Sequence, residues 1–168
     1  MVKIILFGFF CLILSSTVSS ETKTFKINPN WGVAINTDDF TDEKTCSFGQ
    51  ISDALSVLFM NAPNGNHVKD TVAVFSSNAR INGIGIRYRV DKSKPVLLGQ
   101  ENYKYPKYSN TYLVYGKNYK KLVDDFKSGR EVVYQFMSKG EPINDKVYKV
   151  NLMGFTEAYN YTIKCNSN

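Results

Sequence analysis

The segment IGIRYRVD (84–91) has the clearest secondary-structure pattern in this chain of 168 residues. Apolar side chains occupy every second position: Ile84, Ile86, Tyr88 and Val90. The positions between them hold Gly85, Arg87, Arg89 and Asp91. Because successive side chains of a strand point to opposite faces of a sheet, this alternation predicts a half-buried strand with Arg87 and Arg89 on its exposed face.

Similar strand signals lie on both sides of this segment. They are runs rich in β-branched and aromatic residues at 24–27, 31–37, 46–50, 54–61, 70–77, 96–99, 111–116, 130–138 and 146–153. The run at 54–61 is almost continuously apolar, so a buried strand and a helix both remain open there. The whole pattern predicts a mainly β fold, either an antiparallel β-sandwich or a partly open barrel.

Two segments break the strand pattern. In NYKKLVDDFKSG (118–129) the apolar residues follow helical spacing: Tyr119, Leu122, Val123 and Phe126. Gly129 is placed to stop that helix. The closing segment at 154–165 is expected to be a short helix or an irregular tail. We therefore expect about two short helices, one of them near the C-terminus.

The first twenty residues, MVKIILFGFFCLILSSTVSS, begin with a lysine, continue through an apolar block and end in small residues. This is the pattern of a secretory signal peptide, and the block is too short to span a bilayer as a helix. We expect cleavage before Glu21, which leaves a single β-rich domain at 21–168 in the periplasm or outside the cell. An uncleaved N-terminal anchor is the alternative.

The formal net charge is +6 for the whole chain. Without Lys3 the expected mature chain has 20 basic and 15 acidic residues, a net charge of about +5 (20 − 15). Such a basic secreted domain can bind anionic surfaces such as lipid head groups or acidic glycans, although the charge can also serve solubility alone. The compartment argues against nucleic acid as the partner.

Removing the leader also removes Cys11, so Cys46 and Cys165 remain. In an oxidising compartment such a pair most often forms a disulfide, which here would connect an early strand to the C-terminal tail. Two buried or intermolecular thiols are the alternative.

Three stretches of the chain together resemble a known family, and the last of them consists of two segments. They are WGVAINTDDFTDEKTC (31–46), IRYRVDKSKPV (86–96), FKSGREVVYQFM (126–137) and KVNLMGFTEAYNYTIKC (149–165). Their order is similar to that of the invasion-associated locus B family and its relatives among small periplasmic or secreted bacterial and prophage proteins. The resemblance implies a secreted or periplasmic β-rich domain and, for some members, a role in host-cell invasion or virulence. It implies no catalytic residues.

The motif residues of these segments also have a structural interpretation. We expect Trp31 to pack on the core. Asp39, Phe40, Thr41 and Asp42 are interpreted as a turn with Phe40 as an apolar plug. Gly154 would let the chain leave its strand sharply, so that Phe155 turns inward and Ala158 packs closely one helical turn later.

The residue types of common catalytic and metal sites are sparse. The chain has one histidine, His67, in a segment rich in Asn and Gly, which makes a zinc site or a histidine-based triad improbable. A carboxylate cluster at Asp38, Asp39, Asp42 and Glu43 could hold Ca²⁺, but its spacing is not that of an EF-hand. A solvated turn is the better interpretation. We therefore predict no catalytic residues, no metal and no cofactor.

The segment ENYKYPKYSNTY (101–112) is the best candidate for binding. Its tyrosines and lysines interleave: Tyr103, Lys104, Tyr105, Lys107 and Tyr108. Tyrosines provide rigid contact area and lysines attract anions, and Arg87 and Arg89 could extend the same basic surface. An exposed strand edge protected by lysines is the alternative.

These observations predict a non-enzymatic binding protein of the periplasm or the cell exterior, with a role in host interaction. Its partner would be a protein or an anionic ligand of the envelope or host surface. The alternatives are a hydrolase, an envelope-directed hydrolase inhibitor, or an accessory protein of a secretion or prophage system. The sequence leaves the oligomeric state open.

Overall fold

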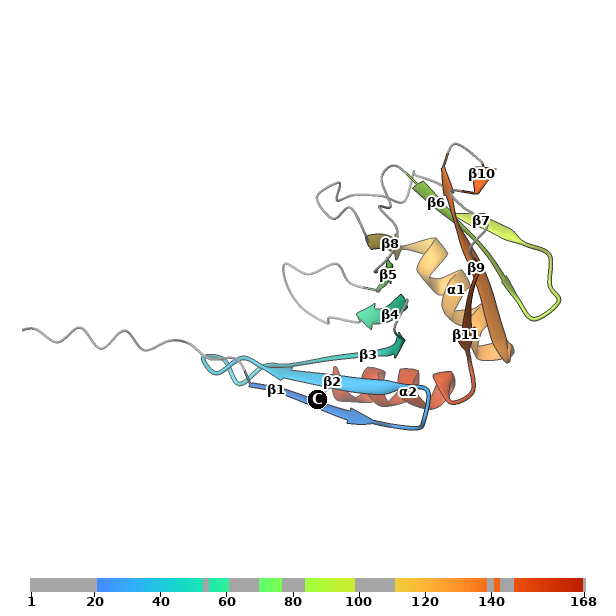
Figure 1. The fold of residues 1–168 in the computed structure, drawn as a ribbon. Helices are drawn as coiled ribbons and strands as arrows, with labels where there is room; N and C mark the ends of the chain where they lie inside the picture. Colours follow the sequence, from blue (N-terminus) through green and yellow to red (C-terminus); the bar gives the residue numbers. More distant parts are fainter. Residues whose placement is uncertain are drawn as a thin grey trace, which may run out of the picture.

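The structure is a computed structural model that describes residues 21–52, 55–60, 70–76, 84–98, 111–138, 141–142 and 147–167. Within these residues the chain forms two antiparallel sheets and two helices (Figure 1). The prediction of a mainly β fold is therefore confirmed. Over the described part of the chain the sheets do not close into a barrel, so the fold is sandwich-like. The expected signal peptide, 1–20, lies outside the described residues.

The first sheet has six strands in the order β1-β2-β3-β4-β5-β8. Their bounds are β1 (Glu21–Lys26), β2 (Gly32–Thr37), β3 (Lys44–Ser52), β4 (Leu55–Met60), β5 (Thr71–Ser76) and β8 (Thr111–Tyr115). The ambiguous apolar run at 54–61 is thus a strand, β4, which pairs with β3 and β5.

The second sheet has five strands and is centred on β9 (Glu131–Ser138). On one edge β9 pairs with β6 (Ile84–Val90), which in turn pairs with β7 (Val96–Leu98). Two short strands, β10 (Glu141–Pro142) and β11 (Tyr148–Asn151), also pair with β9. The sequence analysis assigned no strand to the residues of β10, because a two-residue strand is too short to show periodicity.

The helix α1 (Lys117–Ser128) connects the two sheets through the apolar stripe predicted from its spacing. All four residues of that stripe are buried. The ring centroid of Phe126 lies 5.9 Å from that of Phe59 on β4 and 6.5 Å from that of Tyr88 on β6. The core is therefore continuous from the first sheet through α1 to the second sheet.

Gly129 ends α1 by a different mechanism from the one expected. Its backbone is extended, with φ at −107°, and it is not the left-handed cap that favours glycine. A Cβ at this position would instead collide with Cγ1 of Val90. Glycine is needed here because β6 passes so close to the end of the helix.

Trp31 and Phe155 are both buried, as predicted for each of them, and the structure shows that they meet in one aromatic cluster of the core. Each is 1 % exposed, and their ring centroids are 5.2 Å apart. Phe48 and Phe59 pack against both of them. Ala158 is fully buried in the same core.

Asn28 joins the two motifs that supply this cluster. Its Oδ1 accepts hydrogen bonds from the backbone N–H groups of Asn30 and Trp31, and its Nδ2 donates to the carbonyl of Gly154 at 3.2 Å. Gly154 has φ at 83°, and a Cβ there would collide with the Asn28 amide. The turn before β2 is therefore fixed to the corner that starts α2 (Phe155–Cys165).

The 39–42 turn forms as expected, but Phe40 is not a plug. Its side chain is 88 % exposed. Asp38 organises the turn, since its Oδ1 accepts the backbone N–H groups of Phe40 and Thr41, each at 2.9 Å. These two donors lower the pKa of Asp38. The turn hydrogen bonds are satisfied without any burial of Phe40.

The predicted disulfide between Cys46 and Cys165 is present, with a Cα–Cα distance of 6.1 Å. It joins β3 to the last residue of α2. Next to it, Asn166 forms two hydrogen bonds with the backbone of Cys46: its Oδ1 accepts from the N–H at 2.7 Å, and its Nδ2 donates to the carbonyl at 3.0 Å. The C-terminal tail is thus held to the first sheet by a covalent bond and a paired amide.

Candidate functional site

The outer face of the second sheet gathers basic side chains. The register places Arg89, Val133 and Lys149 opposite one another on β6, β9 and β11, so their side chains share one face. Arg87 lies two residues before Arg89 on the same face, and both arginines are exposed as predicted. We call the exposed set Arg87, Arg89, Lys92, Lys94 and Lys149 the basic face.

Exposed apolar side chains lie among these charges. Leu97 on β7 is opposite Arg87 in the register and is 56 % exposed. Val147 is 49 % exposed and lies two residues before Lys149. The face therefore offers both positive charge and apolar contact to whatever approaches it.

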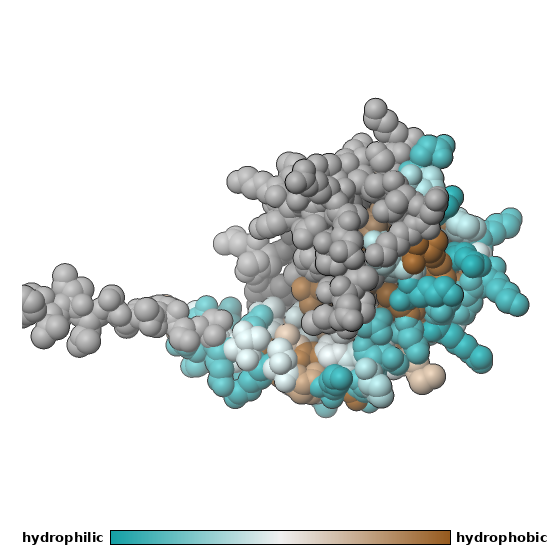
Figure 2. Space-filling view, in the orientation of Figure 1, coloured by the Kyte–Doolittle hydropathy of each residue, from teal (hydrophilic) through white to brown (hydrophobic). Residues whose placement is uncertain are grey.

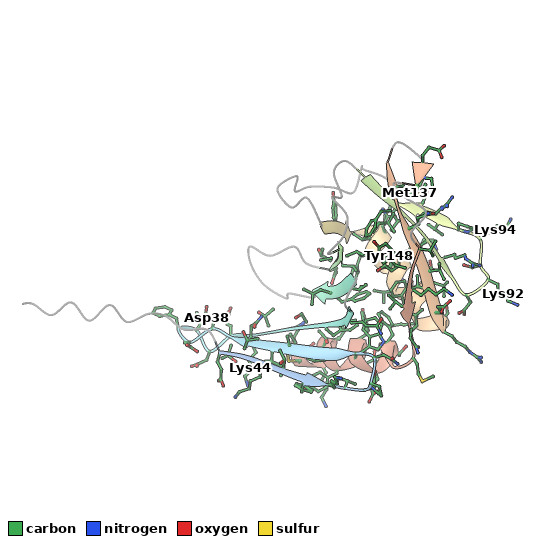
Figure 3. All side chains as sticks on the ribbon, viewed as in Figure 1. Asp38, Lys44, Lys92, Lys94, Met137 and Tyr148 are labelled. Carbon is green, nitrogen blue, oxygen red and sulfur yellow. A yellow bond between two sulfur atoms is a disulfide. The ribbon has the colours of Figure 1, made fainter. Side chains whose placement is uncertain are left out.

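The hairpin between β6 and β7 carries Lys92 and Lys94 at the far end of the molecule from Lys44 (Figure 3). Asp91 holds this hairpin in place. Its carboxylate accepts the backbone N–H groups of Arg130 and Glu131, and its own N–H donates to the carbonyl of Glu131 at 2.8 Å. Figure 2 shows hydrophilic residues gathered over the part of the surface where this hairpin projects.

A glutamine amide and a glutamate carboxylate contact the basic face. Nη2 of Arg87 donates to Oε1 of Gln135 at 2.6 Å, which ties the guanidinium to the neighbouring strand β9. Nζ of Lys149 lies 4.0 Å from the carboxylate of Glu131, a distance at which an exposed ion pair contributes little.

The predicted tyrosine and lysine segment lies outside the described residues. This applies to Tyr103, Lys104, Tyr105, Lys107 and Tyr108, and also to His67. Of the predicted binding residues, the structure therefore places only Arg87 and Arg89. The sequence analysis missed Lys149, because its position beside the arginines depends on strand pairing between segments far apart in the chain.

The carboxylates near residue 40 lie on an exposed turn. Asp38 uses its carboxylate to bind the turn backbone. Among the described residues, no group of three His, Cys, Asp or Glu side chains is arranged to hold a metal ion. The solvated-turn interpretation of this cluster is the one that the geometry favours.

Asp125 on α1 is more than a solvated charge of the helix surface. It accepts the hydroxyl of Tyr88 at 2.7 Å and forms an ion pair with Lys121, also at 2.7 Å. Burial, together with this carboxylate, raises the pKa of Tyr88 well above its ordinary value. The pair connects β6 to α1, and its role is structural.

A second candidate site is a groove between α1 and α2 with a volume of about 610 Å³. Its charged and aromatic lining residues are Asp70, Lys117, Tyr119, Lys120, Asp124, Lys127 and Tyr159. Nζ of Lys127 lies over the Tyr159 ring, 3.9 Å from its centroid, and Lys120 pairs with Asp124 at 3.0 Å. The groove therefore combines phenol, ammonium and carboxylate groups.

The sequence analysis did not identify this groove. Tyr119 was recognised only as part of the apolar stripe, and the lysines only as the polar face of a helix. A usable signal was the first turn of α1, which follows a glycine and holds Lys117 and Lys120 but no acidic residue. That composition opposes the usual preference for acids at a helix N-terminus.

Two comparisons with known proteins add no relative to this description. No protein-family model matches the chain, and no curated protein matches it either. Over the described residues, no helix has the length and apolar composition needed to cross a membrane.

Proposed function

We propose that the protein is a non-enzymatic binding module of the periplasm or the cell exterior that attaches to anionic lipid surfaces through the basic face. The observation that carries this proposal is the register of β6, β9 and β11, which sets Arg87, Arg89 and Lys149 on one exposed face. The resemblance to the invasion-associated locus B family supports an envelope or host surface as the setting.

The chemistry of the basic face suits a lipid interface. Each Lys or Arg near an anionic bilayer surface contributes about 1 kcal/mol of attraction. Leu97 and Val147 add exposed apolar area beside these charges, which can enter the head-group region. The disulfide between Cys46 and Cys165 is compatible with an oxidising compartment.

The test is binding of residues 21–168 to vesicles of phosphatidylcholine with and without phosphatidylglycerol. We expect binding only with the anionic lipid, and a decrease as salt is raised. The double change Arg87→Gln and Arg89→Gln removes two charges, about 2 kcal/mol, and should weaken vesicle binding about thirtyfold.

The matched control removes two exposed lysines from the first sheet, Lys23→Gln with Lys44→Gln. Because Lys44 lies far from the hairpin in Figure 3, this variant should keep most of the vesicle affinity. Equal losses in the two double variants would mean that net charge alone causes binding, and the basic face would then be discarded as the site.

A further inference from the structure

We propose that the groove between α1 and α2 binds a small carboxylate that also carries hydroxyl groups, the chemistry of a uronic acid residue of a glycan. This site is separate from the basic face and does not depend on it. Three features of the groove support the proposal: the N-terminus of α1, the hydroxyl of Tyr119, and the balance of charges along the walls.

The N-terminus of α1 is prepared for an anion. Gly116 precedes the helix with φ at 61°, and no side chain forms a capping hydrogen bond there. The first turn holds Lys117 and Lys120 and no acid, so it has no negative charge of its own to balance the positive end of the helix dipole. Both lysines line the groove, and a ligand carboxylate would provide the missing charge.

The hydroxyl of Tyr119 is an independent sign of a missing ligand atom. The residue is 4 % exposed and its hydroxyl oxygen has no hydrogen-bond partner among the described residues, although buried polar groups are normally paired. Burial, and then the neighbouring Tyr159 and Asp70, raise the pKa of the Tyr119 hydroxyl, and both of these neighbours line the groove, as Tyr119 does. Tyr119 is thus a lining residue of the groove with a closed-in hydroxyl, and a ligand oxygen that reaches this hydroxyl after a side-chain rotation would pair it.

The charges on the walls favour a hydroxylated monoanion over a more highly charged ligand. Asp70 and Asp124 both line the groove, and a dianion such as phosphate would be repelled by them. Asp124 is already paired with Lys120, whereas the carboxylate of Asp70 is suited to accept hydrogen bonds from ligand hydroxyls. Burial, then Asp70 and Asp124, raise the pKa of Tyr159, so its phenol stays protonated and can donate.

The test is a separate titration of the full mature chain with each of D-glucuronate, glucose and inorganic phosphate. Calorimetry and NMR of the α1 amides measure the binding. We expect glucuronate to bind, with glucose and phosphate each at least tenfold weaker. Glucose binding as tight as glucuronate would overturn the role of the helix N-terminus. Phosphate binding as tight as glucuronate would overturn the assignment to a hydroxylated monoanion.

The variant Tyr119→Phe removes only the unpartnered hydroxyl. It should weaken glucuronate binding about five- to tenfold and leave the melting temperature unchanged or raised, a combination that a purely packing role for the hydroxyl would not produce. The control Arg87→Gln with Arg89→Gln should keep full glucuronate affinity, which separates this site from vesicle binding. Unchanged glucuronate affinity in Tyr119→Phe would overturn the proposal.

Discussion

The two helices begin alike and are held very differently. Each starts directly after a glycine with positive φ, Gly116 before α1 and Gly154 before α2. Gly154 is hydrogen-bonded to Asn28, and the other end of α2 is bonded to β3 through Cys165. A Cβ on Gly116 would meet nothing within 4 Å.

The charges at the two helix ends differ in the same way. α2 has Glu157 in its first turn and Lys164 in its last, which is the arrangement that the helix dipole favours. α1 has lysines at both ends and no acid in its first turn. The difference teaches that side chains of α2 itself balance the helix dipole at both of its ends. The first turn of α1 has no such negative charge, and a ligand can supply it.

Among the proposed changes, removal of the disulfide should have the largest effect on the difference in stability between α1 and α2. The double change Cys46→Ser with Cys165→Ser should lower the free energy of unfolding by about 3 to 5 kcal/mol, because the bond closes a long loop. Hydrogen exchange should then show α2 amides no better protected than those of α1. Chemical reduction of the disulfide in the unmodified protein is the control. It should give the same relative protection of the α1 and α2 amides. Intact protection of α2 would show that its packing alone holds it.

A double-mutant cycle at the two glycines tests whether only α2 is anchored at its start. Gly154→Ala should lower the unfolding free energy by about 2 to 3 kcal/mol, from left-handed strain and collision with Asn28. Adding Asn28→Ala should relieve part of that loss, with a coupling of about 1 kcal/mol in chemical denaturation. The effects of Gly116→Ala and Asn28→Ala on the free energy of unfolding should add without coupling. Similar coupling at both glycines would remove the distinction.

The smallest expected effect comes from exchanging the charge at the start of each helix. Lys117→Glu places an acid in the first turn of α1 four residues before Lys121, and should raise the unfolding free energy by about 0.5 to 1 kcal/mol. Glu157→Lys in α2 should lower it by a similar amount. Chemical denaturation measures both. A loss of stability in Lys117→Glu would show that the lysines support the helix itself.

Local patterns were sufficient to predict much of the fold. The alternation at 84–91 and the stripe of α1 each repeat one period over several residues, so every position supports the same interpretation. The positions of Cys46, Trp31 and Phe155 were also informative, since few other roles suit such residues in a small domain. These predictions depend on residue type and spacing alone.

The errors and omissions have a common physical cause. Phe40 was expected to be buried because it is aromatic, yet nothing in the turn sequence says which way the turn faces. Gly129 was interpreted from local helix rules, whereas its actual constraint is Val90, a neighbour in space. The groove likewise depends on how α1 and α2 pack. Such features need the tertiary arrangement, which no single segment encodes.

The side chain of Asn166 has a further consequence for behaviour in solution. Over the described residues β4 pairs with β3 only from Ser47 onward, so no described strand lies beside the backbone of Cys46 on that side. An open stretch of strand edge can recruit another chain and begin aggregation. By occupying both backbone groups of Cys46, the Asn166 amide acts as a one-residue substitute strand. The C-terminal segment that closes the fold therefore also protects this strand edge against self-association.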